Sequence, residues 1–326
     1  MRSVALITGV TGQDGWYLSK LLKSKGYIVH GTTTMNKPNT GELTYSSEYN
    51  AFMHYMDLTD PVGIQYVVDT VEPDEIYNLA AQSHVGLSFK HPTYTYSTTG
   101  LGAASVFHAA LQYQTRTSNQ VKVYQASSSE MFGNAETAIQ DEDTPFTPCS
   151  PYACAKVFAH HVAETYSKAF DLFVCRGILF NHESPRRGSG FVTQKICSAA
   201  AKIKANRQKT LILGNLKSTR DWGYAGDYVE AMWQMMQQDK PDSYVVATGI
   251  EHSIQELLEV AFSYVDLDYT KYVQTSEEFT RANDVTHLCG DAEKARFTFG
   301  WQPKTTFQSM VEHMVAAQMQ ALAQGR

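Results

Sequence analysis

The stretch TGVTGQDGWYLSKLL, residues 8–22, decides the fold of this protein. It follows a short apolar run at 3–8, spaces Gly9, Gly12 and Gly15 three residues apart, and continues into leucines at helical spacing. Glycines are needed in such a loop because the backbone turns tightly and must approach a pyrophosphate without a Cβ in the way. The N-terminus of the following helix offers free N–H groups to the phosphates. The stretch therefore predicts a dinucleotide-binding strand–loop–helix unit rather than an ordinary tight turn.

Strand and helix signals alternate through the rest of the first half. Further strand candidates lie at 27–34, 52–58, 74–81, 121–128 and 172–180. Between them, an apolar stripe with helical periodicity runs from Ile64 to Val71. A long helical segment follows Pro151. Strands that alternate with helices at this spacing indicate a parallel sheet covered on both faces. The predicted fold class is α/β, a doubly wound parallel sheet with a smaller mixed α/β lobe.

The character of the sequence changes after about residue 182. A polar loop, NHESPRRGSG, is followed by a helical segment at 191–206, and Ser253 with Glu256 predicts a capping box. We expect the nucleotide domain to comprise residues 1–181, with returns at about 222–250 and 285–292. The smaller lobe is expected to comprise about 182–221, 251–284 and 293–326.

The composition excludes several kinds of partner. The 326 residues are 43% apolar and 18% charged, with a formal net charge of −6, a poor match for nucleic acid or anionic lipid. No apolar run approaches membrane-spanning length, and five cysteines without a CxxC pair suit reduced thiols better than disulfides or zinc. We therefore expect a cytoplasmic protein with no metal site and no nucleic-acid or membrane partner.

A tyrosine and a lysine stand four residues apart in SPYACAK (150–156), on one face of the helix after Pro151. A tyrosine hydroxyl, with an ordinary pKa of about 10, is a poor base, but a nearby ammonium stabilises the phenolate and lowers that pKa. Such a pair also occurs by chance on exposed helices. Here it follows a strand ending in SSSE (127–130), from which a hydroxyl can reach the same substrate oxygen. Tyr152 and Lys156 are therefore predicted to belong to a reactive centre.

Long stretches of the chain resemble one family, the GDP-mannose 4,6-dehydratases of the extended short-chain dehydrogenase/reductase class. The resemblance is carried by ALITGVTGQDG, EIYNLAAQSHV, YQASSSEMFG, NHESPRRG and TRDWGYAGDYVEAMW, among others. It implies a Rossmann domain that binds NADP and a lyase that acts on GDP-D-mannose. The implied product is GDP-4-keto-6-deoxy-D-mannose, in the synthesis of 6-deoxyhexose nucleotide sugars such as those of fucose and rhamnose.

The resemblance also implies a catalytic set: Ser128, Glu130, Tyr152 and Lys156. Tyr152, with Lys156, would take the proton of the hexose 4-hydroxyl while hydride passes from C4 to the nicotinamide. Glu130 would remove the C5 proton, which the 4-ketone makes acidic, and the 6-hydroxyl would leave as water. The hydride then returns to C6, so the cofactor is regenerated and should stay tightly bound. The family has threonine at the position of Ser128, which keeps the hydroxyl.

The cofactor contacts implied by the resemblance lie in the glycine loop, after strand ends and on the catalytic helix. They are Gly9, Thr11, Gly12, Gln13, Asp14, Gly15, Asp57, Leu58, Leu79, Ala80, Ala81, Ser83, Tyr94, Tyr152, Lys156, His182 and Arg187. NAD sites usually end the second strand with an acid for the ribose 2′-hydroxyl. Residues 29–37, VHGTTTMNK, contain none, and Lys37 and the hydroxyls of Thr32–Thr34 could meet a phosphate. NADP is therefore expected, with NAD as the alternative, although the family's arginine pair is replaced by Thr34 and Met35.

The substrate contacts implied by the resemblance extend into the second half of the chain. They are Ser83, Ser128, Glu130, Tyr152, Asn181, Arg186, Val192, Lys195, Leu213, Gly214, Arg220, Arg281 and Asp284. The arginines offer fork-shaped donors to a diphosphate. Arg281 and Asp284 lie in FTRANDVTHLCGD (279–291), which resembles a family run in which a proline and a glutamate stand at the positions of Ala282 and Asp284.

Other functions remain open at this point. They include dehydration of a related sugar such as a GDP-heptose, added 4-keto reductase activity, a sugar-nucleotide epimerase or reductase, and a catalytically silent nucleotide sensor. The loop NKPNTGELTY (36–45) keeps an Asn-Thr-Gly like that of the family loop that reaches a neighbour's cofactor. A homodimer or homotetramer is therefore expected.

Overall fold

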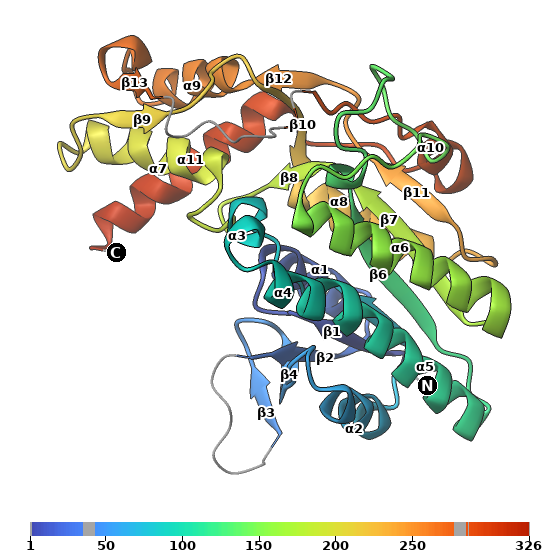
Figure 1. Ribbon diagram of the computed structural model, residues 1–326. Coiled ribbons are helices and arrows are strands. Elements are labelled where there is room, and N and C mark those ends of the chain that lie inside the picture. Colours follow the sequence, from blue (N-terminus) through green and yellow to red (C-terminus); the bar gives the residue numbers. More distant parts are fainter. Residues whose placement is uncertain (1, 35–42, 277–284, 286, 326) are drawn as a thin grey trace.

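An eight-stranded sheet dominates the computed structural model, which describes residues 2–34, 43–276, 285 and 287–325 (Figure 1). Its strands are β1 (Val4–Thr8), β2 (Ile28–Thr33), β3 (Thr44–Ser46), β4 (Ala51–Tyr55), β5 (Glu75–Asn78), β6 (Lys122–Ser128), β7 (Phe173–Leu179) and β11 (Ser243–Val246). The strand order is β11-β7-β6-β5-β1-β2-β4-β3. Neighbouring strands pair in parallel except at the edge, where β3 runs antiparallel to β4. The predicted doubly wound parallel sheet is confirmed.

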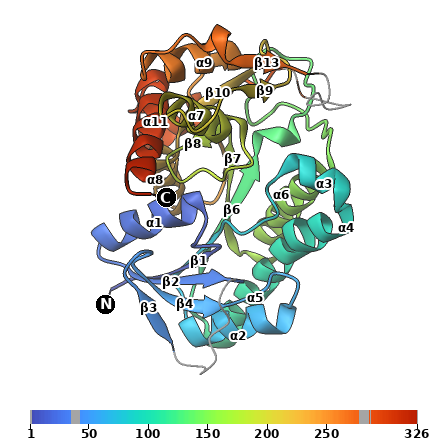
Figure 2. The same ribbon diagram turned by 90° about the vertical axis from the view of Figure 1, so that its left-hand side faces the viewer.

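Helices cover both faces of this sheet (Figure 2). One face carries α1 (Gln13–Ser24), α8 (Ala225–Met236) and α10 (Glu293–Phe299); the other carries α2 (Pro61–Val71), α5 (Gly102–Thr117) and α6 (Pro151–Phe170). A short helical run precedes α5, made of α3 (Val85–Lys90), α4 (Pro92–Thr95) and the π-helix η1 (Tyr96–Leu101). All seven residues of β7 are buried, as expected for a strand covered on both faces. The predicted apolar stripe of α2 is buried from Ile64 to Val71.

The chain changes direction across the sheet between β1 and β5. β2 and β4 lie on one side of β1, whereas β5, β6 and β7 lie on the other, so a topological switch point falls where ligands bind in such folds. Gly9 follows β1 with φ +68°, and a Cβ there would lie 3.0 Å from Cα of Ala80, which follows β5. A Cβ on Gly15 would lie 2.6 Å from Cα of Val10. Glycine at these two positions therefore lets the loop cross the strand ends and α1 pack against them.

The smaller lobe is built around a second core. Its elements are β8 (Asn181–Glu183), α7 (Val192–Lys204), β9 (Leu211–Leu213), β10 (Thr219–Tyr224), β12 (Glu251–Ser253), α9 (Ile254–Ser263), η3 (Tyr269–Lys271), β13 (Val273–Thr275) and α11 (Phe307–Ala323). The strands form the small sheets β12-β10-β8 and β13-β9. Buried side chains such as Trp222, Leu257 and Met314 fill the core between α7, α9 and α11. The predicted capping box of Ser253 and Glu256 is confirmed at the start of α9.

The C-terminal segment divides between the two cores. The sequence assigned 293–326 to the smaller lobe as a whole, but Ala295 and Trp301 pack in the core of the large sheet with α1 and α8. The indole Nε1 of Trp301 donates to the carbonyl of Asp227 at 2.9 Å. Only α11 packs in the smaller lobe. Residue spacing does not say which of two cores a short amphipathic helix covers, so this boundary needed the structure.

The described part of the chain lacks two kinds of feature. None of its helices is both long and apolar enough to cross a membrane. None of its His, Cys, Asp and Glu side chains gather in groups of three or more that could hold a metal ion.

Candidate active site

A cavity of about 410 Å³ lies at the carboxyl ends of β1, β5 and β6, at the switch point. Every residue to which the sequence analysis assigned a cofactor contact lines it, from Gly9 in the glycine loop to Arg187 in the loop after β8. Residues that the sequence analysis did not assign also line it, namely Met56, Val85, Thr98, Ala126, Ser127, Ser129, Leu179, Phe180 and Phe191. Most of these are apolar or small residues, whose type and spacing do not distinguish a cavity wall from a core position.

The glycine loop is fixed to the neighbouring strand by one hydroxyl. Oγ1 of Thr8 accepts hydrogen bonds from the backbone N–H groups of Leu79 and Ala80, each at 3.0 Å, and donates to Oδ1 of Asn78 at 2.9 Å. The ends of β1 and β5 are therefore held together under the cavity. The loop is thus a preformed part of the site rather than a segment that must be ordered by its ligand.

The residues of this cavity fit a dinucleotide. α1 begins after Gly12 without a side-chain cap on its first N–H groups, so these donors are available to a pyrophosphate. Gly9 and Gly12 give such a group close access to the backbone. The hydroxyl oxygen of Thr98, at the wall of the cavity in η1, is buried and has no hydrogen-bond partner among the described residues. A polar ligand would satisfy it.

An acid in the first turn of α1, Asp14, would repel a pyrophosphate if it stood alone. Nε2 of His182 donates to its carboxylate at 2.9 Å, and Nδ1 of the same ring lies 2.7 Å from the carbonyl oxygen of Phe180. Since both partners are acceptors, both ring nitrogens carry protons and the imidazole is charged. Burial tends to raise the pKa of Asp14, but the charge and hydrogen bond of His182 bring it below its ordinary value. The pair therefore presents little net charge to the cavity.

The Asp14–His182 pair joins the glycine loop to the smaller lobe, and Gln13 adds two further hydrogen bonds between them. The amide of Gln13 donates to the backbone carbonyl of His182 at 3.0 Å and accepts from Oγ of Ser184 at 2.8 Å. Burial tends to lower the pKa of His182, but the adjacent carboxylate of Asp14 raises it. The segment with β8 is therefore bound to the start of α1 through two consecutive residues, Gln13 and Asp14.

The four catalytic candidates converge from β6 and α6. Ser128 ends β6, and Glu130 lies in the short 3₁₀-helix η2 (Ser129–Met131) directly after it. The side chain of Ser150 accepts the N–H of Ala153 at 3.1 Å and Pro151 occupies the first turn, which starts α6 just before Tyr152. Hydrogen bonding by Ser128 lowers the pKa of Tyr152, so the two hydroxyls lie near one another. The arrangement therefore gives two hydroxyls that converge on one substrate oxygen, with a carboxylate close by.

The pKa values of the Tyr–Lys pair differ from the sequence expectation. Burial, followed in effect by the charge of Glu130, raises the pKa of Tyr152 to about 12, although the hydrogen bond with Ser128 lowers it. Burial lowers the pKa of Lys156 to about 8. Nζ of Lys156 donates to the carbonyl of Ala126 at 2.6 Å and lies 5.8 Å from the tyrosine ring centre. The expected lowering of the tyrosine pKa is therefore wrong for this structure, because burial has the largest effect on that pKa.

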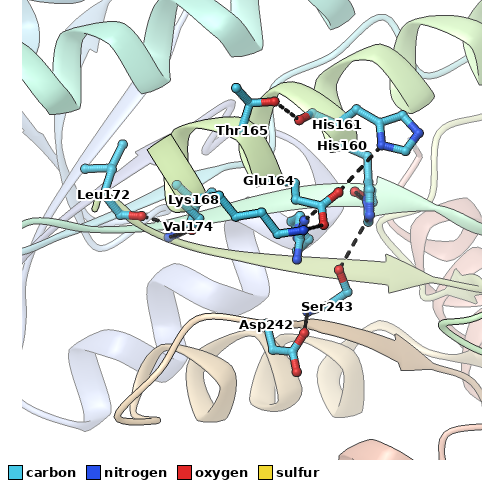
Figure 3. Close-up of polar contacts among 12 residues, drawn as sticks. His160, His161, Glu164, Thr165, Lys168, Leu172, Val174, Asp242 and Ser243 are labelled. Carbon is cyan, nitrogen blue, oxygen red and sulfur yellow. Dashed lines mark hydrogen bonds and ion pairs between the residues drawn. The ribbon is translucent and has the colours of Figure 1, made fainter. Parts of the chain in front are cut away.

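A second contact between α6 and β6 lies one helical turn beyond Lys156. Nδ1 of His160 is 2.8 Å from Oγ of Ser127. Nε2 of the same ring is 3.5 Å from Oγ of Ser243 (Figure 3). Burial, with the charge of Arg176, lowers the pKa of His160 to about 3, so the ring is neutral. Figure 3 also shows Glu164, a further turn along, paired with Lys168 at 2.7 Å. His160 was missed by the sequence analysis, although it continues the four-residue spacing of Tyr152 and Lys156.

A second cavity, of about 210 Å³, adjoins the first at the catalytic carboxylate. Glu130 and Asn181 line both cavities, together with Val85 and Phe191. Of the predicted substrate contacts, Ser83, Ser128 and Tyr152 line the first cavity, and Val192, Leu213, Gly214 and Arg220 line the second. Two ligands lying in these cavities would meet beside Glu130, the position from which that carboxylate can act on one of them.

Two described substrate candidates, Arg186 and Lys195, are not brought to either cavity. The guanidinium of Arg186 pairs with Glu48 at 3.1 Å and stacks over the ring of Trp16 at 4.7 Å. Nζ of Lys195 donates to the carbonyl of Ile212 at 2.7 Å. Neither side chain lines the cavities. Arg281 and Asp284 lie outside the described residues.

The fold and the site define an extended short-chain dehydrogenase/reductase, with a glycine loop at the switch point, a Tyr–Lys pair on α6 and a second lobe. The fold is shared with DesIV, a dTDP-glucose 4,6-dehydratase of Streptomyces venezuelae solved with NAD (TM-score 0.84, 19% identity, 98% of each chain covered). It is also shared with RMD of Pseudomonas aeruginosa, solved with NADPH (TM-score 0.81, 21% identity, 98% and 99% covered).

Sequence similarity identifies the family within this class. The family model described as GDP-mannose 4,6 dehydratase matches residues 6–314. GDP-mannose 4,6 dehydratase 2 of Arabidopsis thaliana is 48% identical over 322 residues, which cover 96% of this chain and 86% of that protein. The chain belongs to the GDP-mannose 4,6-dehydratase family, and the resemblance inferred from the motifs is confirmed.

Proposed function

We propose that this protein is a hydro-lyase that converts GDP-D-mannose into GDP-4-keto-6-deoxy-D-mannose, a step in 6-deoxyhexose nucleotide-sugar synthesis. The observation that carries the proposal is the place of Glu130, which lies two residues after Ser128 and lines both cavities. A simple reductase of this class needs the serine, tyrosine and lysine but has no use for a carboxylate at that point. Membership of the family supports the same activity.

The cofactor proposed for the first cavity is a nicotinamide dinucleotide, preferably NADP. When bound, it supplies an acceptor for the hydride of C4 and a donor of hydride to C6. The uncapped N-terminus of α1 would hold its pyrophosphate, and Lys156 lines the wall beside Tyr152. The preference for NADP is supported by the end of β2, where Thr33 and Thr34 line the cavity and neither described residue is the acid that usually binds a ribose 2′-hydroxyl. Lys37 and Met35 lie outside the described residues.

The chain's own groups would manage the protons. Tyr152 must be ionised to accept the 4-hydroxyl proton, so the hydrogen bond from Ser128 matters because it opposes the effects of burial and of Glu130 on the tyrosine pKa. The same serine hydroxyl can donate to the 4-oxygen. Glu130 then removes the C5 proton, and its protonated form can give that proton to the departing 6-hydroxyl. One carboxylate thereby serves both halves of the elimination.

The second cavity is proposed to hold the GDP part of the substrate. Val192, Leu213 and Gly214 form an apolar wall, and Arg220 lines the same cavity as a donor for a diphosphate. Asn181 stands at the junction beside Glu130, where the hexose must lie. The substrate would thus extend from the catalytic hydroxyls into the smaller lobe.

The decisive experiment is incubation of the purified protein with GDP-mannose. We expect loss of one water from the sugar nucleotide, detected by mass spectrometry, and a 4-keto product without net reduction of added NADP. Net reduction of the cofactor in proportion to product would indicate a plain dehydrogenase, and no reaction would contradict the proposal. Release of the dinucleotide on denaturation, followed by chromatography, would distinguish NADP from NAD.

We also propose that the protein works as a homodimer or homotetramer in the cytoplasm. The helices η1 and α6 are in contact, and they carry the exposed apolar side chains Tyr96, Leu101 and Phe158. Such a patch favours association with a second copy. Residues 36–42 of the loop that first suggested an oligomer lie outside the described residues. A monomeric mass by light scattering at micromolar concentration would contradict the oligomer, and cell fractionation would test the compartment.

A further inference from the structure

The imidazole of His84 lines the second cavity without belonging to any site assigned above. It follows β5 and precedes α3, and its Nδ1 accepts a hydrogen bond from the backbone N–H of Leu87 at 3.1 Å. The ring lies against Phe191, with ring centres 5.7 Å apart. The side chain is therefore held in place from both sides.

That backbone contact decides where the proton of the ring resides. A nitrogen that accepts a hydrogen bond uses its lone pair, so the N–H of the His84 ring is on Nε2. No described residue accepts a hydrogen bond from this Nε2. A Cβ on Gly190 would lie 3.1 Å from Nε2, so the glycine leaves this edge of the ring open. The wall of the cavity thus carries a donor that the protein itself does not use.

The position of this donor is near the catalytic end of the second cavity. Val85, next to His84, and Phe191, next to Gly190, line both cavities together with Glu130. The second cavity is also lined by residues from β9 onward, such as Leu213 and Arg220. His84 therefore faces the part of a bound nucleotide sugar that lies beside Glu130, which is the hexose.

We propose that His84 is a substrate-binding residue that donates from Nε2 to a hydroxyl of the hexose. The inference rests on the proposed function. The 4-hydroxyl is taken by Tyr152 and Ser128, and the 6-hydroxyl departs as water, so the hydroxyls left for His84 are those at C2 and C3. Mannose differs from glucose in its configuration at C2 and from altrose in its configuration at C3. His84 is thereby a determinant of which GDP-sugar is accepted.

The substitution His84→Asn separates the two roles of this ring. The amide oxygen of asparagine can accept the N–H near the start of α3 as Nδ1 does, whereas no atom replaces the Nε2 donor. Binding of GDP-mannose and of GDP is measured by calorimetry on the cofactor-loaded enzyme. We expect the dissociation constant for GDP-mannose to rise about 3- to 10-fold, as for the loss of one neutral hydrogen bond, while that for GDP stays unchanged.

A sugar analogue identifies the hydroxyl. Wild-type enzyme should bind GDP-2-deoxymannose or GDP-3-deoxymannose more weakly than GDP-mannose, and His84→Asn should show no such difference for the analogue that lacks the contacted hydroxyl. Unchanged GDP-mannose binding by a folded His84→Asn variant overturns the inference. An equal loss of GDP affinity also overturns it, because the contact would then be with the diphosphate. A wild-type enzyme that makes no 4-keto product would contradict the proposed function, whereas the hexose contact is decided by the binding differences alone.

Discussion

Asp14 and His182 are 168 residues apart in the chain and 2.9 Å apart in the structure, where a carboxylate accepts a hydrogen bond from a doubly protonated imidazole. The pair joins the glycine loop to the start of the smaller lobe. Because both side chains are largely buried, each stabilises the charged form of the other. This contact gives the protein a pH-dependent component of stability.

The substitution Asp14→Asn should lower the free energy of unfolding by an amount that depends on pH. The lowered pKa of Asp14 stabilises the fold above its unfolded value of 3.8, and the raised pKa of His182 stabilises it below 6.5, an effect lost as pH rises through the folded value. We expect the variant to lose roughly 1.5–3 kcal/mol of unfolding free energy between these limits, and less in alkaline solution. Urea unfolding at a series of pH values measures this. The exposed Asp239→Asn is the control, and a loss that does not change with pH would contradict the prediction.

Ser128 should set the pH dependence of catalysis through Tyr152. Its hydrogen bond lowers the tyrosine pKa, which burial raises to about 12, so Ser128→Ala should raise that pKa further. We expect the rising limb of kcat/KM against pH to move upward by about one to two units, the value of one hydrogen bond to a charged group. Ser128→Thr keeps the hydroxyl and should leave the profile in place. Equal profiles for the alanine and threonine variants would rule out this role.

Removing the carboxylate of Glu130 should stop the elimination while leaving cofactor binding intact. We expect Glu130→Gln to lower the rate of product formation by about 10²- to 10⁴-fold, the usual contribution of a general base. Exchange of the C5 hydrogen with D₂O, followed by NMR, should be lost in parallel. Glu136→Gln, an exposed acid in the following loop, is the matched control. Undiminished product formation by Glu130→Gln would contradict the role of this carboxylate as the C5 base.

His160 should position the catalytic strand rather than take part in the reaction. Together, the contacts of Lys156 with Ala126 and of His160 with Ser127 hold β6 against α6 at successive helical turns. His160→Asn can keep the contact with Ser127 through its amide, whereas His160→Gln places its amide toward Ser243. We expect kcat to fall about fivefold more in the glutamine variant, with KM for GDP-mannose unchanged, since one neutral hydrogen bond differs. Equal kcat values in the two variants would contradict a positioning role.

The end of β2 should control the choice of dinucleotide. Thr34 lines the first cavity at the point where NAD enzymes carry an acid and many NADP enzymes carry a base. We expect Thr34→Arg to tighten NADP binding relative to NAD by about tenfold, and Thr34→Asp to change the ratio in the opposite direction. Titration of the cofactor-free enzyme with each dinucleotide measures the ratio. A ratio that both substitutions leave unchanged would place the 2′-phosphate elsewhere.

Much of the fold could be predicted because its signals are local. The Gly9–Gly15 spacing, the apolar stripe ending at Val71 and the capping box at Ser253 each depend on the geometry of one strand, turn or helix, and all three are confirmed. The assignment of α10 was wrong because Ala295 and Trp301 could fill either of two cores equally well by sequence. Local spacing does not report which distant surface a short helix covers.

The candidate site likewise has some features that depend on local sequence and others that depend on tertiary contacts. By itself, the sequence determined the class of chemistry, since the glycine loop, the serine at 128 and the pair Tyr152 and Lys156 are set by short-range spacing. Only the tertiary structure decided that Arg186 turns away to Glu48 and that His182 carries two protons beside Asp14. It also decided that, among the described residues, none accepts a hydrogen bond from Nε2 of His84. These properties arise from contacts between residues far apart in the chain, where burial and hydrogen-bond partners fix the direction and protonation of a side chain.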